Sequence, residues 1–225
     1  RDSKRRKMSK SLGNSPEPVE LMKKYSADGV RVGMLLCSPA GNDLLFDESL
    51  TEQGRNFGNK IWNAFRLIKT WQISDEIAQP LESVLAVEWF KSKLDSGIKE
   101  MDDHFKKYRI SDALMVIYKL FRDEFSSWYL EIVKPAYQKP IDRNTYLQTT
   151  EFFEKLLKLL HPFMPFITEE IWQYLSERMK GESIMLTAMP KAGKADQQII
   201  AHFEMAKEII TAIRGLRSEN GIDRN

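Results

Sequence analysis

Hydrophobic residues recur every three or four positions along most of the chain, which is the spacing of amphipathic helices. After residue 48 this spacing persists over long stretches, whereas the first 48 residues hold only short periodic runs. The long helices that the pattern predicts cover residues 49–68, 83–105, 111–134, 152–160, 163–175 and 196–216. We therefore expect a mainly α protein.

Polar caps and prolines mark the ends of these predicted helices. Ser49 and Glu52 have the spacing of a capping box, so a helix should begin at Ser49. Ser111 is expected to cap the most hydrophobic helix, which Pro135 ends. The apolar face of the 49–68 helix spans roughly 100°, and the residues expected to be buried on it are Leu50, Phe57, Ile61, Ala64, Phe65 and Ile68.

The predicted helix at 111–134 is rich in aromatic residues, among them Phe121, Phe125, Trp128 and Tyr129. Exposed aromatic rings form stacking platforms for nucleic-acid bases. These rings, however, recur at helical spacing, which favours packing inside a core. We expect them to be core residues.

Shorter segments lie outside the long helices. We expect helices at 19–25 and 26–36, the second capped by Ser26 and stopped by residues 38–42, followed by an extended stretch at 44–46. Residues 183–186 should form a short strand or extended tail, and residues 190–194 a linker. The residues of the last helix expected to face inward are Ile200, Phe203, Ala206, Ile210 and Ile213.

These changes of pattern divide the chain into three parts. Residues 1–48 form a connector, residues 49–190 a helical bundle, and residues 191–225 the start of a C-terminal segment. The chain begins with Arg1 and shows no hydrophobic signal segment, and its last helix has no partner for its apolar face. We therefore expect a piece of a longer protein, truncated at Asn225.

The composition argues against several classes of protein. Charged residues make up 29% and hydrophobic residues 42%, and no stretch approaches the roughly 18 consecutive apolar residues of a membrane span. The single cysteine, Cys37, lies in an apolar run, and His104, His161 and His202 are far apart, so we expect no disulfide and no metal site. A cytoplasmic protein with no membrane partner fits this composition.

The net charge of +2 is spread unevenly along the chain. Residues 1–70 contain 13 basic and 8 acidic residues, a surplus of 5. The first third is therefore the expected place of contact with phosphate groups.

The pentad Lys7-Met8-Ser9-Lys10-Ser11, followed by Leu12-Gly13-Asn14, carries the clearest chemical signal. Two lysines and two hydroxyls on a short loop suit a triphosphate, because charge builds on phosphoryl oxygens in the transition state of phosphoryl chemistry. A charge run alone would indicate a solvated basic turn. The pentad with its Leu-Gly-Asn tail resembles the signature loop of class I aminoacyl-tRNA synthetases. That resemblance implies an ATP-binding loop with Lys7 and Lys10 as catalytic residues and Lys10 facing the phosphates.

A polar stripe opposes the buried face of the 49–68 helix. Arg55, Asn59, Asn63 and Arg66 fall within roughly 80° of one another around its axis. A solvated helix face is one interpretation of this stripe. Guanidinium and amide groups, however, read base edges and phosphates, which favours nucleic-acid recognition.

Downstream motifs narrow the resemblance to the bacterial valyl-tRNA synthetase family, and the isoleucyl and leucyl relatives fit them less well. The motifs are Gly41-Asn42-Asp43 with Phe46-Asp47, Gly54-Arg55-Asn56-Phe57, Asn59-Lys60, Trp62-Asn63-Ala64-Phe65-Arg66, Trp128-Tyr129-Leu130-Glu131 with Lys134, and residues 160–172. Two departures stand out: Arg5 occupies a position where glycine is expected, and Ser127 one where the family often has an acid.

The resemblance implies an antiparallel helical bundle of the anticodon-binding type, preceded by a short α/β connector that carries the ATP loop. It implies tRNA(Val), ATP and valine as partners of the full-length enzyme, Mg²⁺ with the ATP, and no DNA. The residues implied in tRNA contact are Arg55, Asn59, Lys60, Asn63 and Arg66, with Arg214 and Arg217 in second rank.

The nucleotide-binding fold of that family would lie before Arg1, and no His-x-Gly-His sequence occurs in the chain. We therefore predict that the chain is part of a valine–tRNA ligase and is inactive alone. The alternatives are a stand-alone RNA-binding helical module, the isoleucyl counterpart, and a helical scaffold for protein partners. Residues that select the amino acid would also lie upstream.

Overall fold

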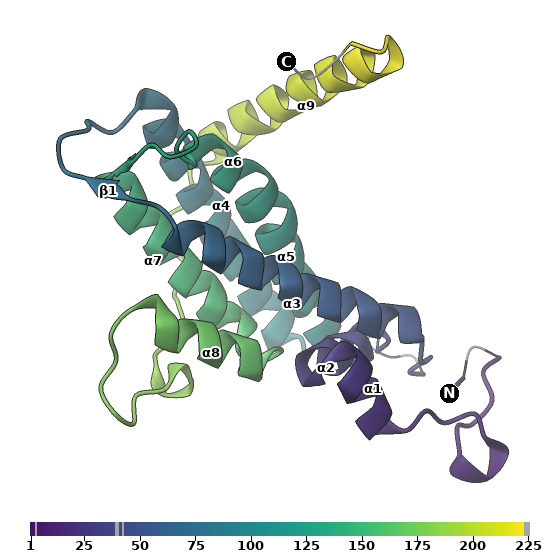
Figure 1. Cartoon of the computed structure of the whole chain (residues 1–225). Helices are drawn as coiled ribbons and strands as arrows, with labels where there is room; N and C mark the ends of the chain where they lie inside the picture. The colour runs from purple at the N-terminus through teal and green to yellow at the C-terminus, as the bar shows by residue number, and fades with distance from the viewer. Residues whose placement is uncertain (3, 39–40, 42, 223–225) are drawn as a thin grey trace.

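The computed structural model of the chain describes residues 1–2, 4–38, 41 and 43–222. The predicted helix stop at residues 38–42 falls partly outside them, as do Asn42 of the proposed motif and the last residues, 223–225. Helices dominate the described residues (Figure 1). The helices are α1 (Pro18–Tyr25), α2 (Ala27–Leu36), α3 (Glu48–Lys69), α4 (Leu81–Lys106), α5 (Ile110–Lys119), α6 (Leu130–Val133), α7 (Arg143–Leu160), α8 (Pro165–Leu175) and α9 (Gln197–Glu219).

Short elements complete the chain. Two 3-10 turns occur, η1 (Lys10–Leu12) and η3 (Ile184–Leu186), and a π-helical segment, η2 (Leu120–Tyr129), joins α5 to α6. The strands β1 (Ile73–Ser74) and β2 (Ile141–Asp142) pair in parallel, with Ile73 opposite Ile141. The expected mainly α fold is confirmed. The stretch at 44–46 bonds to Arg1 through its backbone, Phe46 N donating to the Arg1 carbonyl at 2.9 Å, without forming a strand.

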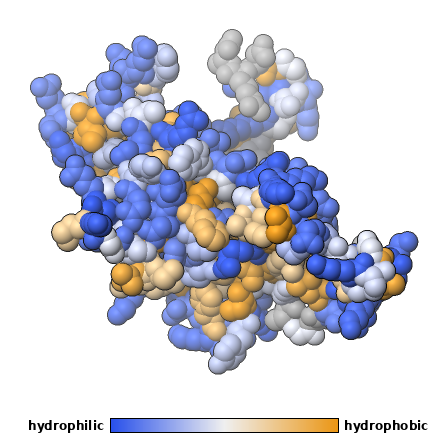
Figure 2. All heavy atoms as spheres, turned by 60° about the horizontal axis from the view of Figure 1, so that its bottom comes forward, coloured by the Kyte–Doolittle hydropathy of each residue, from blue (hydrophilic) through white to orange (hydrophobic). Residues whose placement is uncertain are grey.

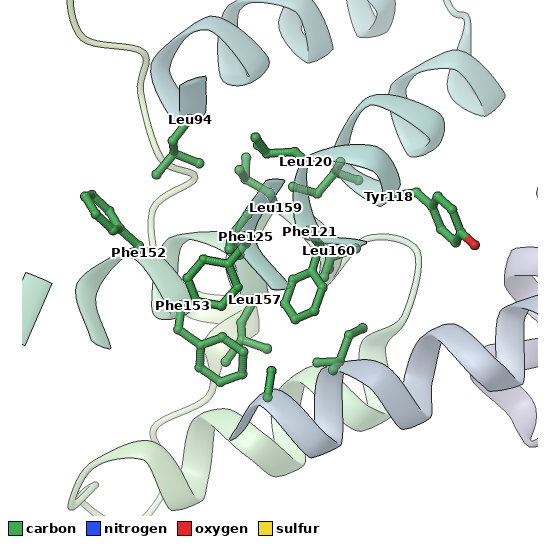
Figure 3. Packing of buried hydrophobic residues seen from close by; sticks show 14 of the residues in the cluster. Leu94, Tyr118, Leu120, Phe121, Phe125, Phe152, Phe153, Leu157, Leu159 and Leu160 are labelled. Carbon is green, nitrogen blue, oxygen red and sulfur yellow. The ribbon is translucent and has the colours of Figure 1, made fainter. Parts of the chain in front are cut away.

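The hydrophobic core lies where α4, the α5–η2–α6 helix and α7 meet, with α3 and α8 against one side (Figure 3). Phe121, Phe125 and Tyr129 of η2 are fully buried. The ring centroids of Phe125 and Phe153 lie 5.9 Å apart and those of Phe90 and Phe125 5.2 Å apart. The aromatic residues of the 111–134 helix therefore form core, as their spacing predicted.

Three predictions about element ends were wrong. Asp47 caps α3 by accepting a hydrogen bond from the Ser49 backbone at 2.9 Å, because the helix begins at Glu48 and Ser49 already lies inside its first turn. Ser111 lies inside α5 and instead donates to the carbonyls of Leu35 at 2.6 Å and Ser38 at 2.5 Å. The short strand or extended tail predicted at 183–186 is instead the turn η3 over Ile184–Leu186, whose N-terminus is capped by the Ser183 hydroxyl.

The prediction for the last helix was half right. It forms as α9, capped by Asp196, and Phe203 stacks on Trp89 with ring centroids 3.9 Å apart. Ala206, Ile210 and Ile213, expected to face inward, are exposed. The reason is visible in Figure 1, where α9 continues past the end of the bundle after its first turns.

The connector packs directly on the bundle through α2, which lies against α3. Gly54 permits this approach, because a Cβ atom there would lie 2.5 Å from the carbonyl oxygen of Gly29. In the first turn of α2, the Asp28 carboxylate accepts hydrogen bonds from the backbone amides of Phe166 at 3.3 Å and Ile167 at 2.7 Å, at the start of α8. The division of the chain at residue 48 stays a prediction.

The lower part of the molecule in Figure 1, built by α1, α2 and α8, comes forward in Figure 2. Hydrophobic side chains gather near the middle of that face, between hydrophilic margins (Figure 2). On α1 and α8, Val19 and Phe166 are 51% and 63% exposed. Apolar surface is therefore exposed on one helix of the connector, α1, and on one helix of the bundle, α8.

Candidate functional site

The basic pentad forms a protruding loop at the N-terminal end of the chain (Figure 1). Its centre is the single turn η1, where the Ser9 hydroxyl accepts a hydrogen bond from the Leu12 backbone at 3.3 Å. Gly13 closes the turn with a φ of 64°, a left-handed conformation that glycine adopts without strain. The sequence thus encodes the shape of the loop locally.

Asp2 and Asn14 fasten the base of this loop. The Asp2 carboxylate accepts from the backbone amides of Lys4 and Arg6 at 3.0 and 2.8 Å, and from the Asn14 side chain at 3.1 Å. Asn14 in turn accepts from the Ser9 backbone at 3.0 Å. Burial acts to raise the pKa of Asp2, but hydrogen bonds from Asn14 and Arg6 outweigh it and hold that pKa well below its usual range. The sequence pattern gave Asp2 no role, and it marked Asn14 only as part of the motif that follows the pentad.

The two lysines of the pentad are exposed to solvent. The Lys10 side chain is 87% exposed, and its Nζ lies 3.7 Å from a carboxylate oxygen of Glu17. The hydroxyls of Ser9 and Ser11 are 3.2 Å apart, and Met8 is half-buried against a hollow of 840 Å³. The loop therefore presents ammonium and hydroxyl groups outward, where they can reach phosphate oxygens.

The polar stripe of α3 is divided by the structure. Asn59, Asn63 and Arg66 are exposed, as a recognition surface requires. Arg55 is half-buried and turns towards the connector, with one guanidinium nitrogen 3.5 Å from the Lys24 carbonyl and another 3.6 Å from Glu52. Arg55 therefore takes part in contacts within the protein as well as offering a positive charge.

Lys60 and the amide side chains of α3 line a groove between α3 and the η2–α6 segment. Two adjoining hollows of 520 and 300 Å³ form it, and both contain Asn56 and Lys60. The groove residues are Ser49, Glu52, Gln53, Asn56, Phe57, Asn59, Lys60, Asn63, Ala64, Leu67, Tyr118, Arg122, Ser126, Leu130 and Glu131. Sequence analysis missed the wall formed by η2, although Arg122 and Ser126 on the polar side of the aromatic helix were a signal for it.

Helix α9 lies on the other side of η2. Its docked part is held by an alternating network: Lys207 is 2.8 Å from both Glu124 and Glu204, and Lys93 is 2.7 Å from Glu204. Arg214, a second-rank candidate, lies 5.4 Å from the ring centroid of Trp128. The second-rank candidate Arg217 is half-buried. These arginines are separated from the α3 groove by the η2 helix.

The side chains of Cys37 and His161, which could carry chemistry, lie in packed surroundings. Burial raises the pKa of the Cys37 thiol, and burial lowers the pKa of His161, whose Nδ1 lies 2.8 Å from the Thr168 hydroxyl. Within the described residues, no group of three or more His, Cys, Asp or Glu side chains is placed to hold a metal ion. Across the same residues, no helix is long and apolar enough to cross a membrane.

Comparison with known protein families places the fold. Residues 87–225 match the family described as the anticodon-binding domain of tRNA ligases, and residues 1–47 match the class I tRNA synthetases for isoleucine, leucine, methionine and valine. The chain belongs to the anticodon-binding domain family of tRNA ligases, joined to a class I synthetase segment that contains the pentad loop. The expected resemblance to class I synthetases is confirmed.

The relatives point to one member of that class. The valine–tRNA ligases of Parabacteroides distasonis and Porphyromonas gingivalis are each 59% identical over 222 residues, covering 99% of this chain and 25% of those proteins. The valine–tRNA ligase of Fusobacterium nucleatum is 38% identical over 234 residues, covering 99% of this chain and 26% of that protein. The chain thus spans about a quarter of the length of these relatives.

A solved structure shares the fold. The Agrobacterium radiobacter K84 agnB2 LeuRS, in a ternary complex with tRNA and LeuAMS, superposes with a TM-score of 0.59 at 20% identity. The match covers 88% of this chain and 23% of that one. At this identity the likeness shows the helical fold alone.

Proposed function

We propose that this chain is the part of a valine–tRNA ligase that supplies the ATP loop and the anticodon-binding bundle. The observation that carries the proposal is the 57 to 59% identity to valine–tRNA ligases over 99% of the chain, because this likeness spans the loop and the groove together. The full enzyme activates valine with ATP and transfers it to tRNA(Val) in the cytoplasm.

In the first step, an oxygen of the valine carboxylate attacks the α-phosphorus of ATP. A bond from that oxygen to phosphorus forms, the bond to the bridging oxygen breaks, and pyrophosphate leaves with the electron pair. Lys7 and Lys10 stabilise the charge that grows on the phosphoryl oxygens and pyrophosphate. Their exposure allows the loop to close over ATP. Ser9, Ser11 and Met8 shape the loop around the phosphates.

Mg²⁺ is proposed to accompany ATP in the full enzyme, where it would help to neutralise the charge of the triphosphate. The described residues hold no cluster of carboxylates that fits a resident metal site. Ammonium and hydroxyl groups of the loop are instead suited to the phosphate oxygens themselves.

The helical bundle is proposed to bind the anticodon region of tRNA rather than DNA. Unstacked loop bases expose their edges, and amide side chains on a helix can bond to them. Asn59 and Asn63 line the groove and Arg66 is exposed beside them, while Lys60 supplies a positive charge. Arg55, held by the connector, is proposed to contact tRNA only at the edge of this surface.

The test is to measure binding of the chain to valine tRNA, isoleucine tRNA and an anticodon-swapped pair, each at low and moderate salt. Affinity that follows the valine anticodon supports recognition by the bundle. Affinity that follows the isoleucine anticodon supports the isoleucyl counterpart. Equal affinity for all four that is lost with salt supports a generic RNA-binding module, and no salt-dependent binding supports a protein scaffold.

A second test concerns catalysis by the chain alone. We expect no valine-dependent exchange between ATP and pyrophosphate, because the nucleotide-binding fold is expected to lie outside the 225 residues. Measurable exchange by the purified chain would show that this division of labour is wrong.

A further inference from the structure

Lys60 of α3 and Arg122 of η2 line the same hollow of the groove, and the Ser127 hydroxyl links the Lys60 side chain to the Arg122 backbone. The Lys60 Nζ donates to the Ser127 Oγ at 3.5 Å, and this hydroxyl donates to the Arg122 carbonyl at 2.8 Å. The Arg122 side chain is 54% exposed; its Nε lies 3.9 Å from an Asp123 carboxylate oxygen, and its guanidinium carbon lies 5.8 Å from the centroid of the Tyr118 ring. Two cations from separate helices therefore border one hollow.

The π-helical form of η2 creates this arrangement. In an α-helix, residues five positions apart point about 140° away from each other. The π-helix bonds each residue to the fifth one along, so Arg122 and Ser127 lie one above the other and both can face α3. An α-helical segment would turn one of them away from the groove.

The Lys60 ammonium has no acidic partner in the described part of the chain. Among the described residues, no carboxylate lies within ion-pair distance of its Nζ, whose recorded contact is the neutral Ser127 hydroxyl. The acids nearest the groove are engaged elsewhere: Glu131 lies 2.7 Å from Lys134, and Glu52 lies 3.6 Å from Arg55. The charge on Lys60 is consequently available for an external anion.

We infer that Lys60 and Arg122 bind a backbone phosphate of the RNA whose bases meet the amides of α3, and that Ser127 keeps Lys60 free for it. The inference rests on the proposed function, since it assigns one contact of the tRNA bound there. Ser127 holds the ammonium in place as a neutral acceptor. A carboxylate at that position would pair with Lys60 and neutralise the site.

The experiment measures binding of valine tRNA to the chain over a range of salt concentrations. The charge variant is Ser127→Asp. One matched control is Ser127→Asn, which has the size of aspartate without its charge. The other is Ser127→Ala, which removes the hydroxyl that donates to the Arg122 carbonyl. Losing one phosphate contact lowers the slope of log affinity against log salt by about 0.7, a relative loss of about five-fold between 1 M and 0.1 M salt. We expect this change for Ser127→Asp and for Arg122→Gln, and under about two-fold change for both controls.

Combining the Lys60 and Ser127 substitutions distinguishes ion pairing from damage to the fold, because ion pairing makes their effects on the salt slope non-additive. Lys60→Gln should lower the slope by about 0.7 in the wild-type chain but change it little in the Ser127→Asp chain, where Lys60 is already paired. Circular dichroism of each variant checks that the helices remain. Equal effects of Lys60→Gln in both backgrounds would overturn the inference.

Two further outcomes have distinct meanings. If the wild-type chain binds valine tRNA and both Ser127→Asp and Arg122→Gln retain its salt slope, the phosphate site is wrong and the proposed function stands. If the wild-type chain does not bind valine tRNA, the proposed function fails first. Displacement of RNA by inorganic phosphate beyond that by chloride at equal ionic strength would overturn the inference in favour of a free-anion site.

Discussion

Asp28 on α2 ties the connector to the bundle, and its replacement by alanine is expected to destabilise the fold. The side chain is 5% exposed, and its two carboxylate oxygens accept the backbone amides of Phe166 and Ile167 at 3.3 and 2.7 Å. These amides begin α8, where no residue of the helix's own sequence provides a side-chain cap. Asp28 therefore caps α8 from a distance of 138 residues along the chain.

The size of the effect follows from these contacts. A fully buried amide left without a partner costs about 1 to 3 kcal/mol, and because these two are only part-buried, losing both bonds amounts to roughly 2 to 3 kcal/mol. Burial raises the pKa of Asp28 more than its two hydrogen bonds lower it, so the charged carboxylate is itself costly to bury. Removing this charge in the alanine variant recovers part of the lost stability. We expect Asp28→Ala to lower the free energy of unfolding by about 2 kcal/mol.

Thermal or urea unfolding followed by circular dichroism measures this change. For a chain of this size, a loss of about 2 kcal/mol lowers the Tm by about 4 to 8 °C. Asp196→Ala is the matched control, since Asp196 also accepts two backbone amides, at 2.9 and 3.2 Å, but at the exposed start of α9. Its loss should be under about 1 kcal/mol because water replaces the carboxylate. Equal losses for the two variants would refute the argument from burial.

Three other changes test the packing, the loop and the docking of α9. Gly54→Ala places a Cβ 2.5 Å from a carbonyl oxygen of α2 and should cost about 1 to 3 kcal/mol in urea unfolding, whereas Gly58→Ala on the same helix, with its nearest neighbour at 3.6 Å, should be neutral or stabilising. Arg5 has a φ of 62°, so Arg5→Gly should relieve about 1 kcal/mol of strain and slow hydrogen exchange of the loop amides. Burial acts to raise the pKa of Glu204, but hydrogen bonds from two lysines outweigh this effect and lower the pKa overall. The Glu204 carboxylate therefore stabilises the docking of α9 above pH 4.5, and this stabilisation is lost as the pH falls below that value. Tryptophan fluorescence should report that α9 loosens in acid, and Glu204→Gln should lack this transition.

Features that depend on neighbouring residues could be predicted from the sequence. Helical spacing of Phe121, Phe125 and Tyr129 identified core positions, because burial on one face requires that period. The position of Arg5, where glycine was expected, has the left-handed backbone that glycine favours. The pentad loop and the class I resemblance were likewise visible in contiguous residues, since Gly13 and the Ser9 hydroxyl shape the turn through local bonds.

Contacts between groups far apart in the chain became visible in the folded structure. Ser111 was expected to cap its own helix, yet it bonds to carbonyls at the end of α2, and the cap of α8 comes from Asp28. Polar residues such as Arg122 on the aromatic helix were a signal for the wall of the groove, but which helix that wall faces was set by packing. The exposure of Ile213, where α9 leaves the bundle, was outside the reach of local patterns. Periodicity tells which face of a helix is apolar, but the element that covers this face is set by packing between segments far apart in the chain.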